Sequence, residues 1–302
     1  MTAVRIDGRP LADRLRTSID EELQVLRLSE IDPGLATVLV GDDPAAAAYE
    51  RHVQRLAEGL GYHYVCDRLA GDVATADALA TIGKLNADPR VTGILVLRPL
   101  PAHLDEADLD STVDPRKDIE AAHPVNAGLL ALGKPRFVPS TPASCFYALD
   151  AYLRSSGRDP AGFYAGAVIC VVGRSSSVGK PAQWLALHRN ASVISCHSRT
   201  FAAGRLPELT SIADVLLVAA GVPRLITRDM VRPGAIVLDV GFHQLDDGSI
   251  VGDVDPDVAE VAEAITPVPG GIGPITDVWL VGNTLAAAAI ARQVEPRFGT
   301  SG

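Results

Sequence analysis

The chain has 302 residues and a formal net charge of −10, from 27 Lys and Arg against 37 Asp and Glu. Hydrophobic residues make up 47% of it and charged residues 21%, which is enough apolar material for a core and excludes disorder of the whole chain. The acidic balance argues against nucleic acid as the main partner, because phosphate backbones bind basic surfaces. The length allows one large domain or two ordinary ones.

No targeting or membrane segment is predicted. Arg5, Asp7 and Arg9 interrupt the first residues, so they do not form the apolar block of a signal peptide. The longest uncharged runs, Pro160–Gly173 and Val278–Ala291, are shorter than the roughly 20 residues of a membrane span. The four cysteines lie far apart without a CxxC pair, which indicates free thiols and no metal site. We therefore expect a cytoplasmic protein without a membrane partner.

Strands and helices alternate through the first half of the chain. Apolar residues at helical spacing predict a first helix after Gly8-Arg9-Pro10. The next elements are predicted as a strand at 35–40, a helix at 49–59, a strand near 63–66, a helix at 75–85 and a strand at 93–97. A helix containing Tyr147 and Leu153 follows. This alternation is typical of a parallel sheet and predicts an α/β fold.

The second half begins with a polar stretch, Ser155–Gly166, which we interpret as a domain linker. Four strand candidates follow it, namely Val168–Val172, Ser192–Cys196, Val215–Ala219 and Ile236–Val240. The last helix is predicted at about Asp277–Arg292 and is rich in alanine.

A glycine-containing loop, Gly173–Pro181, comes directly after the first of these strands. Glycines allow backbone N–H groups to approach a phosphate closely, and a helix N-terminus carries partial positive charge. The spacing matches neither GxGxxG nor GxxxxGK[ST], so the loop alone is a weak signal. The next strand is followed by Ser198 and Arg199 rather than by an acidic residue. Arg174 and Arg199 are therefore predicted to bind a 2′-phosphate, which favours NADP over NAD; the alternative is that both are ordinary surface charges.

Further segments carry a family resemblance. They are Gly234–Gly241, Val251–Asp255, Ile265–Thr276, which contains the sequence PVPGGIGPIT, and Asn283-Thr284. Together with the Gly173–Pro181 loop and the segment Cys196–Thr200, they resemble the methylenetetrahydrofolate dehydrogenase/cyclohydrolase family, known as FolD. The resemblance extends over nearly the whole chain.

The resemblance implies two α/β domains with a cleft between them, in a homodimer. Residues 1–150 with 275–302 would form the tetrahydrofolate-type substrate domain, and residues 151–274 the Rossmann-type NADP-binding domain. It implies substrate contacts by Pro269, Gly270, Gly271 and Ile272. It implies cofactor contacts by Gly173, Arg174, Ser175, Ser198, Arg199, Gly221 and Thr276. The alternative for the Val268–Gly273 loop, which contains these four residues, is a tight interdomain turn.

The folate half departs from the family motifs at catalytic positions. The motif Ser-x-x-Tyr-Val-x-x-Lys keeps its tyrosine as Tyr49 but has Val53 at the lysine position. The glutamine that orients this lysine is replaced by Leu97. The four-residue spacing predicts that Val53 shares with Tyr49 a side that faces the cleft. Glu120 takes the place of the carboxylate that binds the pterin, although spacing alone does not choose between it and Asp118.

These departures affect the two family activities differently. Hydride transfer needs mainly positioning of donor and acceptor, whereas cyclohydrolase chemistry requires activation of water and proton transfer. With aliphatic Val53 and Leu97, we predict that cyclohydrolase activity is weak or absent. His52 is a candidate general base near Tyr49, or a solvated surface histidine. Arg98 is predicted to point away from Leu97 and is a poor proton shuttle.

The leading hypothesis is an NADP-dependent 5,10-methylenetetrahydrofolate dehydrogenase. A second hypothesis is an NADP-dependent oxidoreductase that acts on a different cyclic amine or imine, since the departures are confined to the folate half. A third is a non-catalytic ligand-binding or partner protein.

Overall fold

The computed structural model describes residues 2–298 and divides the chain into two compact units. The six-stranded unit contains the residues up to Arg14 and Thr141–Thr276. The three-stranded unit contains Leu15–Ser140 and the residues from Asp277 onward. The chain passes from one unit to the other within three helices, namely α1 (Arg9–Leu28), α6 (Ser140–Ser155) and α11 (Ile272–Ala291).

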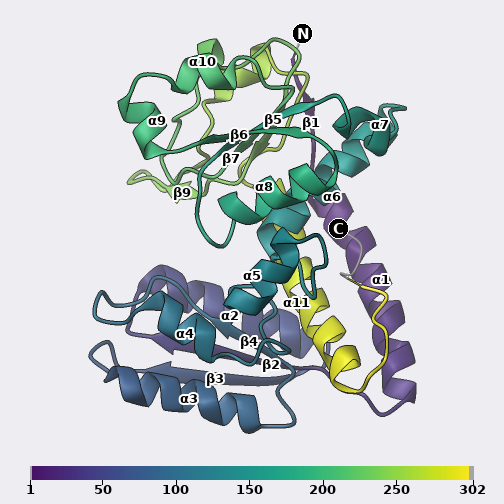
Figure 1. The fold of residues 1–302 in the computed structure, drawn as a ribbon, viewed down its shortest axis with the longest axis vertical. Coiled ribbons are helices and arrows are strands. Elements are labelled where there is room, and N and C mark those ends of the chain that lie inside the picture. The colour runs from purple at the N-terminus through teal and green to yellow at the C-terminus, as the bar shows by residue number, and fades with distance from the viewer. Residues whose placement is uncertain (1, 299–302) are drawn as a thin grey trace. The chain divides into compact units, whose positions relative to one another are not determined.

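The six-stranded unit is built on a parallel sheet in the order β1-β11-β8-β7-β5-β6. Figure 1 labels four of these strands, β1, β5, β6 and β7. Its strands are β1 (Val4–Arg5), β5 (Val168–Val172), β6 (Ser192–Cys196), β7 (Val215–Val218), β8 (Ile236–Asp239) and β11 (Ala264–Ile265). The central strands read VICVV and VLLV, the continuous apolar runs of strands that are buried on both faces. An antiparallel pair, β9 (His243–Gln244) and β10 (Ile250–Val251), lies outside this sheet.

Short helices accompany this sheet. They are α7 (Pro160–Tyr164), α8 (Gly179–His188), α9 (Ser198–Ala202), α10 (Leu206–Thr210) and the 3₁₀ turns η1 (Arg228–Met230) and η2 (Pro256–Glu260). One core cluster joins β5, β6, β7 and β8 with Leu206 of α10 and Val258 of η2. This packing holds the carboxyl ends of β5, β6 and β7 together.

The three-stranded unit has a parallel sheet in the order β3-β2-β4, with β3 at His63–Leu69, β2 at Gly34–Val40 and β4 at Gly93–Val96 (Figure 1). Its other helices are α2 (Pro44–Gly59), α3 (Thr75–Ala87), α4 (Glu106–Thr112) and α5 (Pro124–Ala131). Because side chains alternate along a strand, Ala36, Val38 and Val40 pack with α3 and α4, whereas Leu39 packs with α2.

Helix α2 carries several of the predicted site residues. Its N-cap is Asp43, whose side chain accepts a hydrogen bond from the Ala46 N–H (2.8 Å), and Pro44 occupies the first turn. The buried positions are Ala46, Glu50, Val53 and Ala57, which recur at helical spacing. The local sequence therefore determines both the start of α2 and its buried face.

Helix α11 is longer than the sequence predicts, because it begins at Ile272 and not near Asp277. By length and composition it is the one helix within residues 2–298 that is apolar enough to cross a membrane. However, 72% of its most apolar window is buried inside the protein, as in the core helix of a globular fold. Gly282 allows this burial, since a Cβ there would lie 2.2 Å from the ring of Phe298.

The predicted linker at Ser155–Gly166 is wrong. This stretch lies inside the six-stranded unit and contains α7, which begins after the N-cap Asp159. Tyr164 at the end of α7 is buried and donates a hydrogen bond to Asp150 (2.6 Å). The stretch is polar because its turns are exposed, while its one large buried aromatic side chain joins the core.

The divisions also differ from the predicted domain boundaries of 150/151 and 274/275. The N-terminal residues pair with the six-stranded sheet, where Val4 and Arg5 lie in register with Ala264 and Ile265. Residues 141–150 belong to the same unit. Two-residue strands such as β1 carry no periodicity that a sequence pattern can detect. The four longer strands predicted in the second half are confirmed as β5 to β8.

Candidate functional site

The six-stranded unit has a cavity of about 350 Å³ at the carboxyl ends of its central strands. The chain passes from β5 to β6 on one side and then returns to β7 on the other, so the strand order reverses between β5 and β7. Residues that follow both strands line the cavity, among them Gly173 and Ala219. In parallel α/β sheets this reversal point is where ligands bind.

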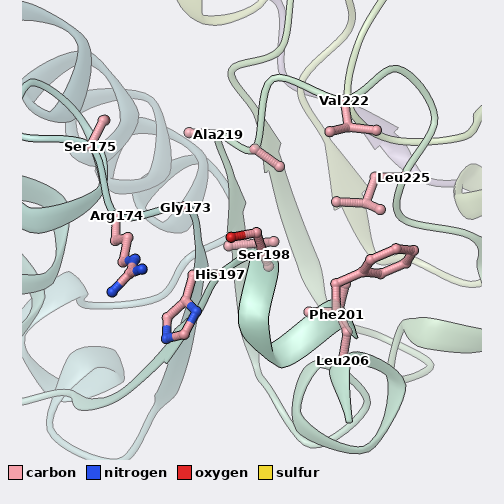
Figure 2. A pocket seen from close by; sticks show the side chains of 12 residues that line it. Gly173, Arg174, Ser175, His197, Ser198, Phe201, Leu206, Ala219, Val222 and Leu225 are labelled. Carbon is pink, nitrogen blue, oxygen red and sulfur yellow. The ribbon is translucent and has the colours of Figure 1, made fainter. Parts of the chain in front are cut away.

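The walls of this cavity differ in character (Figure 2). Polar side chains come from the loops after β5 and β6, namely Arg174, Ser175, His197 and Ser198. Apolar side chains come from α9, α10 and the loop after β7, namely Phe201, Leu206, Val222 and Leu225. Such a cavity can hold a ligand with an anionic part and a flat apolar part.

Glycines make the polar wall possible. Gly173 has φ +134°, and a Cβ on it would lie 2.2 Å from the Ala219 carbonyl oxygen. A Cβ on Gly179, at the start of α8, would lie 2.3 Å from the Gly173 carbonyl oxygen. The Ser175 hydroxyl accepts hydrogen bonds from the N–H groups of Val178 (3.1 Å) and Gly179 (3.2 Å). The loop is therefore tightly closed onto the N-terminus of α8.

His197 is oriented by its own backbone surroundings. It caps α9, with Nδ1 accepting a hydrogen bond from the Arg199 N–H (3.2 Å). Because Nδ1 is the acceptor, the neutral ring of this cavity-lining residue carries its proton on Nε2, which is then a donor. Such a donor favours an anionic ligand.

The predicted cofactor residues do not all reach this cavity. Gly173, Arg174, Ser175 and Ser198 line it, whereas Arg199, Gly221 and Thr276 are not among its lining residues. The Gly221 N–H donates to Asp253 (2.9 Å), and the Thr276 hydroxyl donates to the Ile272 carbonyl (3.2 Å) within the first turns of α11.

Two buried carboxylates hold the loop after β7. Asp253 accepts hydrogen bonds from the N–H groups of Ala220 and Gly221 and pairs with His243 Nε2 (2.7 Å). Asp239 accepts from the N–H groups of Gly241, Asp253 and Val254. Burial raises the pKa of Asp239 to about 6, although these hydrogen bonds oppose the shift. The Asp239–Gly241 and Val251–Asp255 motifs therefore act on the loop backbone.

The Pro269–Ile272 loop packs against the N-terminal segment. The Gly8 N–H donates to the Gly270 carbonyl (2.8 Å), and a Cβ on Gly8 would lie 1.7 Å from the Gly271 carbonyl oxygen. A Cβ on Gly271 would lie 2.6 Å from the Pro267 carbonyl oxygen, and Gly270 has φ +103°. This close packing accounts for both glycines of the loop, so they are not by themselves a sign of a ligand.

The three-stranded unit gathers ionisable side chains around Tyr49. The ring of Tyr49 is 38% exposed, and its surroundings raise the pKa of the phenol. Loss of water around the phenol is the largest cause, followed by the negative charges of Glu120 and Asp277. Tyr49 is therefore a neutral hydrogen-bond donor over the physiological pH range.

Glu120 and Asp118, which spacing could not separate, have different roles. The Asp118 carboxylate accepts from the N–H groups of Ala122 (3.0 Å) and His123 (2.9 Å) and closes its own loop. Glu120 accepts from the Ser140 hydroxyl (2.9 Å) and N–H (3.1 Å). Burial raises the pKa of Glu120 to about 7, while the bonds from Ser140 oppose this shift.

Asn283 holds the two segments that meet at Glu120. Its Nδ2 donates to the carbonyl oxygens of Ile119 (2.7 Å) and Val138 (2.9 Å). Ile119 directly precedes Glu120, and Val138 lies two positions before Ser140. Asn283 is part of the resemblance, but no local sequence pattern connects it with Glu120.

Val53 and Leu97 are both buried. Val53 is 0% exposed and lies on the buried face of α2, whereas Tyr49, four residues before it, is 38% exposed. Leu97 is 3% exposed and packs with Leu39 and Ala46. Neither side chain can exchange a proton.

Arg98 and His52 both have acidic partners. Arg98 donates to Asp110 on α4 (2.6 Å) and lies 3.5 Å from Glu106. His52 Nε2 lies 2.8 Å from Asp277 Oδ2, and the His52 and Tyr49 ring centroids are 6.5 Å apart. Sequence reasoning missed Asp277 because it lies 225 residues from His52; its signal is a lone carboxylate in an otherwise apolar helix.

The cysteines are free thiols, and Cys170 and Cys196 lie on neighbouring strands with their sulfur atoms 3.7 Å apart. Across residues 2–298, no group of three or more His, Cys, Asp and Glu side chains is arranged to hold a metal ion.

Two family models match the chain. One is described as the catalytic domain of tetrahydrofolate dehydrogenase/cyclohydrolase and matches residues 6–120. The other is the NAD(P)-binding domain of the same enzyme and matches residues 139–292. The chain belongs to the tetrahydrofolate dehydrogenase/cyclohydrolase family. The first match contains Tyr49 and Glu120, and the second contains the cavity at β5 and β7.

Relatives resemble the chain over almost its full length. "Bifunctional protein FolD 3" of Rubrobacter xylanophilus is 57% identical, over 98% of this chain and 96% of its own. A crystal structure of the bifunctional FolD enzyme from Campylobacter jejuni is 35% identical with a TM-score of 0.88, over 95% of this chain and 99% of its own. The FolD enzyme of Trypanosoma brucei, solved with NADP cofactor and inhibitor, is 31% identical with a TM-score of 0.87, over 97% of this chain and 100% of its own.

Proposed function

We propose that this protein is an NADP-dependent 5,10-methylenetetrahydrofolate dehydrogenase whose methenyltetrahydrofolate cyclohydrolase activity is weak or absent. The proposal rests on a contrast between the residues that this chain keeps for binding and the residues that it lacks for proton transfer. The cavity after β5 and β7 has the polar and apolar walls that suit a dinucleotide, and the chain keeps Tyr49 and Glu120, yet the two positions that would move protons hold buried Val53 and Leu97.

NADP fits the cavity of the six-stranded unit by chemistry. Arg174, Ser175 and the Nε2–H group of His197 supply donors for phosphate oxygens, and Phe201 supplies an apolar surface for a flat base. Among residues 2–298, no acidic side chain lines this cavity, which favours a phosphorylated ribose over a free one. Bound NADP accepts the hydride in this reaction.

The residues of the three-stranded unit would bind and orient the folate. Glu120 can accept a hydrogen bond when ionised and donate one when protonated, and both forms are present near neutral pH because its pKa is about 7. Tyr49 donates a hydrogen bond or packs against a flat ring. Hydride transfer needs this positioning and no proton acceptor at residue 53.

Val53 and Leu97, the aliphatic pair, would protect the methenyl product from water. The methenyl group formed by hydride loss is a cation that water attacks. Val53 and Leu97 offer no group that holds or activates water, so hydrolysis at their position is disfavoured.

The test is NADPH formation from methylenetetrahydrofolate and NADP, with NAD in place of NADP as the matched control. NADPH formation that exceeds NADH formation supports the proposal. If NADPH forms at none of the enzyme concentrations tested, the proposal is contradicted. If NADP then binds without folate, the cyclic amine or imine oxidoreductase is favoured; if both bind without turnover, a non-catalytic role is favoured.

A cytoplasmic homodimer is also part of the proposal. The free thiols are compatible with a reducing compartment. Sedimentation velocity would measure the oligomeric state, and a monomer at all concentrations would contradict it.

A further inference from the structure

His52 and Asp277 form a hydrogen-bonded pair beside Tyr49 in the three-stranded unit. His52 Nε2 and Asp277 Oδ2 are 2.8 Å apart, and the His52 ring lies 6.5 Å from that of Tyr49. The His52 side chain is 40% exposed and that of Asp277 is 25% exposed, so water reaches the pair. Asp277 also lies close enough to raise the pKa of Tyr49. The pair and the phenol therefore belong to one polar group of side chains.

The pairing determines which nitrogen of His52 can act as a base. Burial raises the pKa of Asp277 and the bond from His52 opposes this shift, as expected for a carboxylate that accepts from the ring. Nε2–H donates to Oδ2, which leaves the lone pair on Nδ1. No hydrogen bond to Nδ1 is present among residues 2–298. His52 thus has the arrangement of a histidine base that a carboxylate orients.

A structural role does not explain this pair. The comparable pair, His243 and Asp253, holds a loop, because Asp253 also accepts from two backbone N–H groups. Within the described residues, the Asp277 carboxylate has no hydrogen-bond partner other than His52. Partly exposed ion pairs stabilise a fold by at most about 1 kcal/mol. The position beside Tyr49 is the feature that indicates a chemical role.

We propose that His52, oriented by Asp277, is the general base for the slow hydration of the methenyl substrate in this protein. The inference rests on the proposed function, since that function supplies the substrate. The oxygen of water bonds to the bridging methenyl carbon while His52 Nδ1 takes a proton from that water. The carbon–N5 bond then breaks as N5 takes the proton from His52, the hydroxyl proton passes to solvent, and the 10-formyl group remains. One water is consumed and one proton is released.

The experiment measures hydrolysis of methenyltetrahydrofolate supplied directly, with a buffer blank. We expect His52→Ala to lower kcat about 100-fold or to the blank rate, since a general base contributes about 10²–10⁴ in rate, with little change in KM. Added imidazole should restore hydrolysis in His52→Ala. Asp277→Asn, which keeps the shape but not the charge of its side chain, should lower kcat by a smaller factor. His103→Gln is the matched control, because His103 is an exposed histidine of the same unit that bonds only to the Val73 carbonyl, and it should leave hydrolysis unchanged.

NADPH formation by the same variants separates a chemical role from a structural one. The inference is supported if His52→Ala keeps hydride transfer but loses hydrolysis, and if added imidazole restores that hydrolysis. Unchanged hydrolysis in His52→Ala, equal loss of both activities without rescue, or a wild-type rate no faster than the blank would overturn it. A failure of the proposed function would give a different result. The wild-type protein would then form no NADPH, whatever its rate of methenyl hydrolysis.

Discussion

The two units make their candidate sites in different ways. In the six-stranded unit the backbone shapes the site, since Gly173 and Gly179 approach neighbouring carbonyl oxygens too closely for any side chain. In the three-stranded unit side chains make the site, namely Tyr49, Glu120, His52 and Asp277. A site made by backbone changes only if the loop changes, whereas a site made by side chains can lose one chemistry and keep its fold. The departures from the family pattern are accordingly found in the second.

The largest effect is expected for Gly173→Ala. The new Cβ would meet the Ala219 carbonyl 2.2 Å away, at a φ of +134° that alanine adopts only with strain, so the cavity wall must move. We expect NADP binding to weaken by about 100-fold or more, measured by calorimetry, which corresponds to about 3 kcal/mol. The control is Gly166→Ala, where a Cβ meets no atom within 4 Å. NADP affinity equal to wild type would show that the backbone does not shape this site.

The next effect concerns the aliphatic pair. Replacing Val53 by Lys together with Leu97 by Gln should raise methenyl hydrolysis about 100-fold, because the change supplies a base and a partner amide at two positions that now hold aliphatic side chains. Val53 is fully buried, so the single change to Lys should destabilise the protein more than the double change does. Hydrolysis and thermal unfolding measure the two parts. A folded double variant with no gain would show that the missing pair does not limit hydrolysis.

A smaller effect is expected for Arg174→Ala. A charge-assisted hydrogen bond contributes about 1.5–3 kcal/mol, so NADP should bind about 10–100-fold more weakly while NAD binding changes little. Arg199→Ala is the matched control, since Arg199 does not line the cavity, and its effect should be smaller. If both variants lose NADP affinity equally, the assignment of the phosphate to Arg174 is incorrect.

A last effect is a change in how stability depends on pH. Folding raises the pKa of Glu120 from 4.5 to about 7, so between these values the folded protein holds more protons than the unfolded chain. Its contribution to stability therefore falls as pH rises through this range, by about 3 kcal/mol at most. Glu120→Gln should remove that part of the pH dependence. Denaturant unfolding at about pH 4 and pH 8 measures it, and the same change in stability for both proteins would show that Glu120 is not its source.

Local sequence signals are stronger in the six-stranded unit than in the three-stranded unit. The Gly173 loop is predicted from its position after a strand, because glycine spacing is a local signal. Arg174 lines the cavity and Arg199 does not, and spacing alone could not distinguish them because it does not determine which way a side chain on α9 points.

The rest depended on contacts between distant segments. Asp277 meets His52 across 225 residues, and Asn283 joins Ile119 and Val138, so no local pattern contains either contact. Helical spacing related Val53 to Tyr49 but could not show that the two residues differ in burial. The polar composition of Ser155–Gly166 wrongly predicts a linker, although the single buried Tyr164 anchors this stretch to the core.

The most direct test follows three species in one time course after the protein is mixed with methylenetetrahydrofolate and NADP. We predict that NADPH and methenyltetrahydrofolate rise together in equal amounts, with 10-formyltetrahydrofolate forming more slowly. Absence of NADPH, or formyl product that keeps pace with NADPH while no methenyl compound accumulates, would contradict the proposed function.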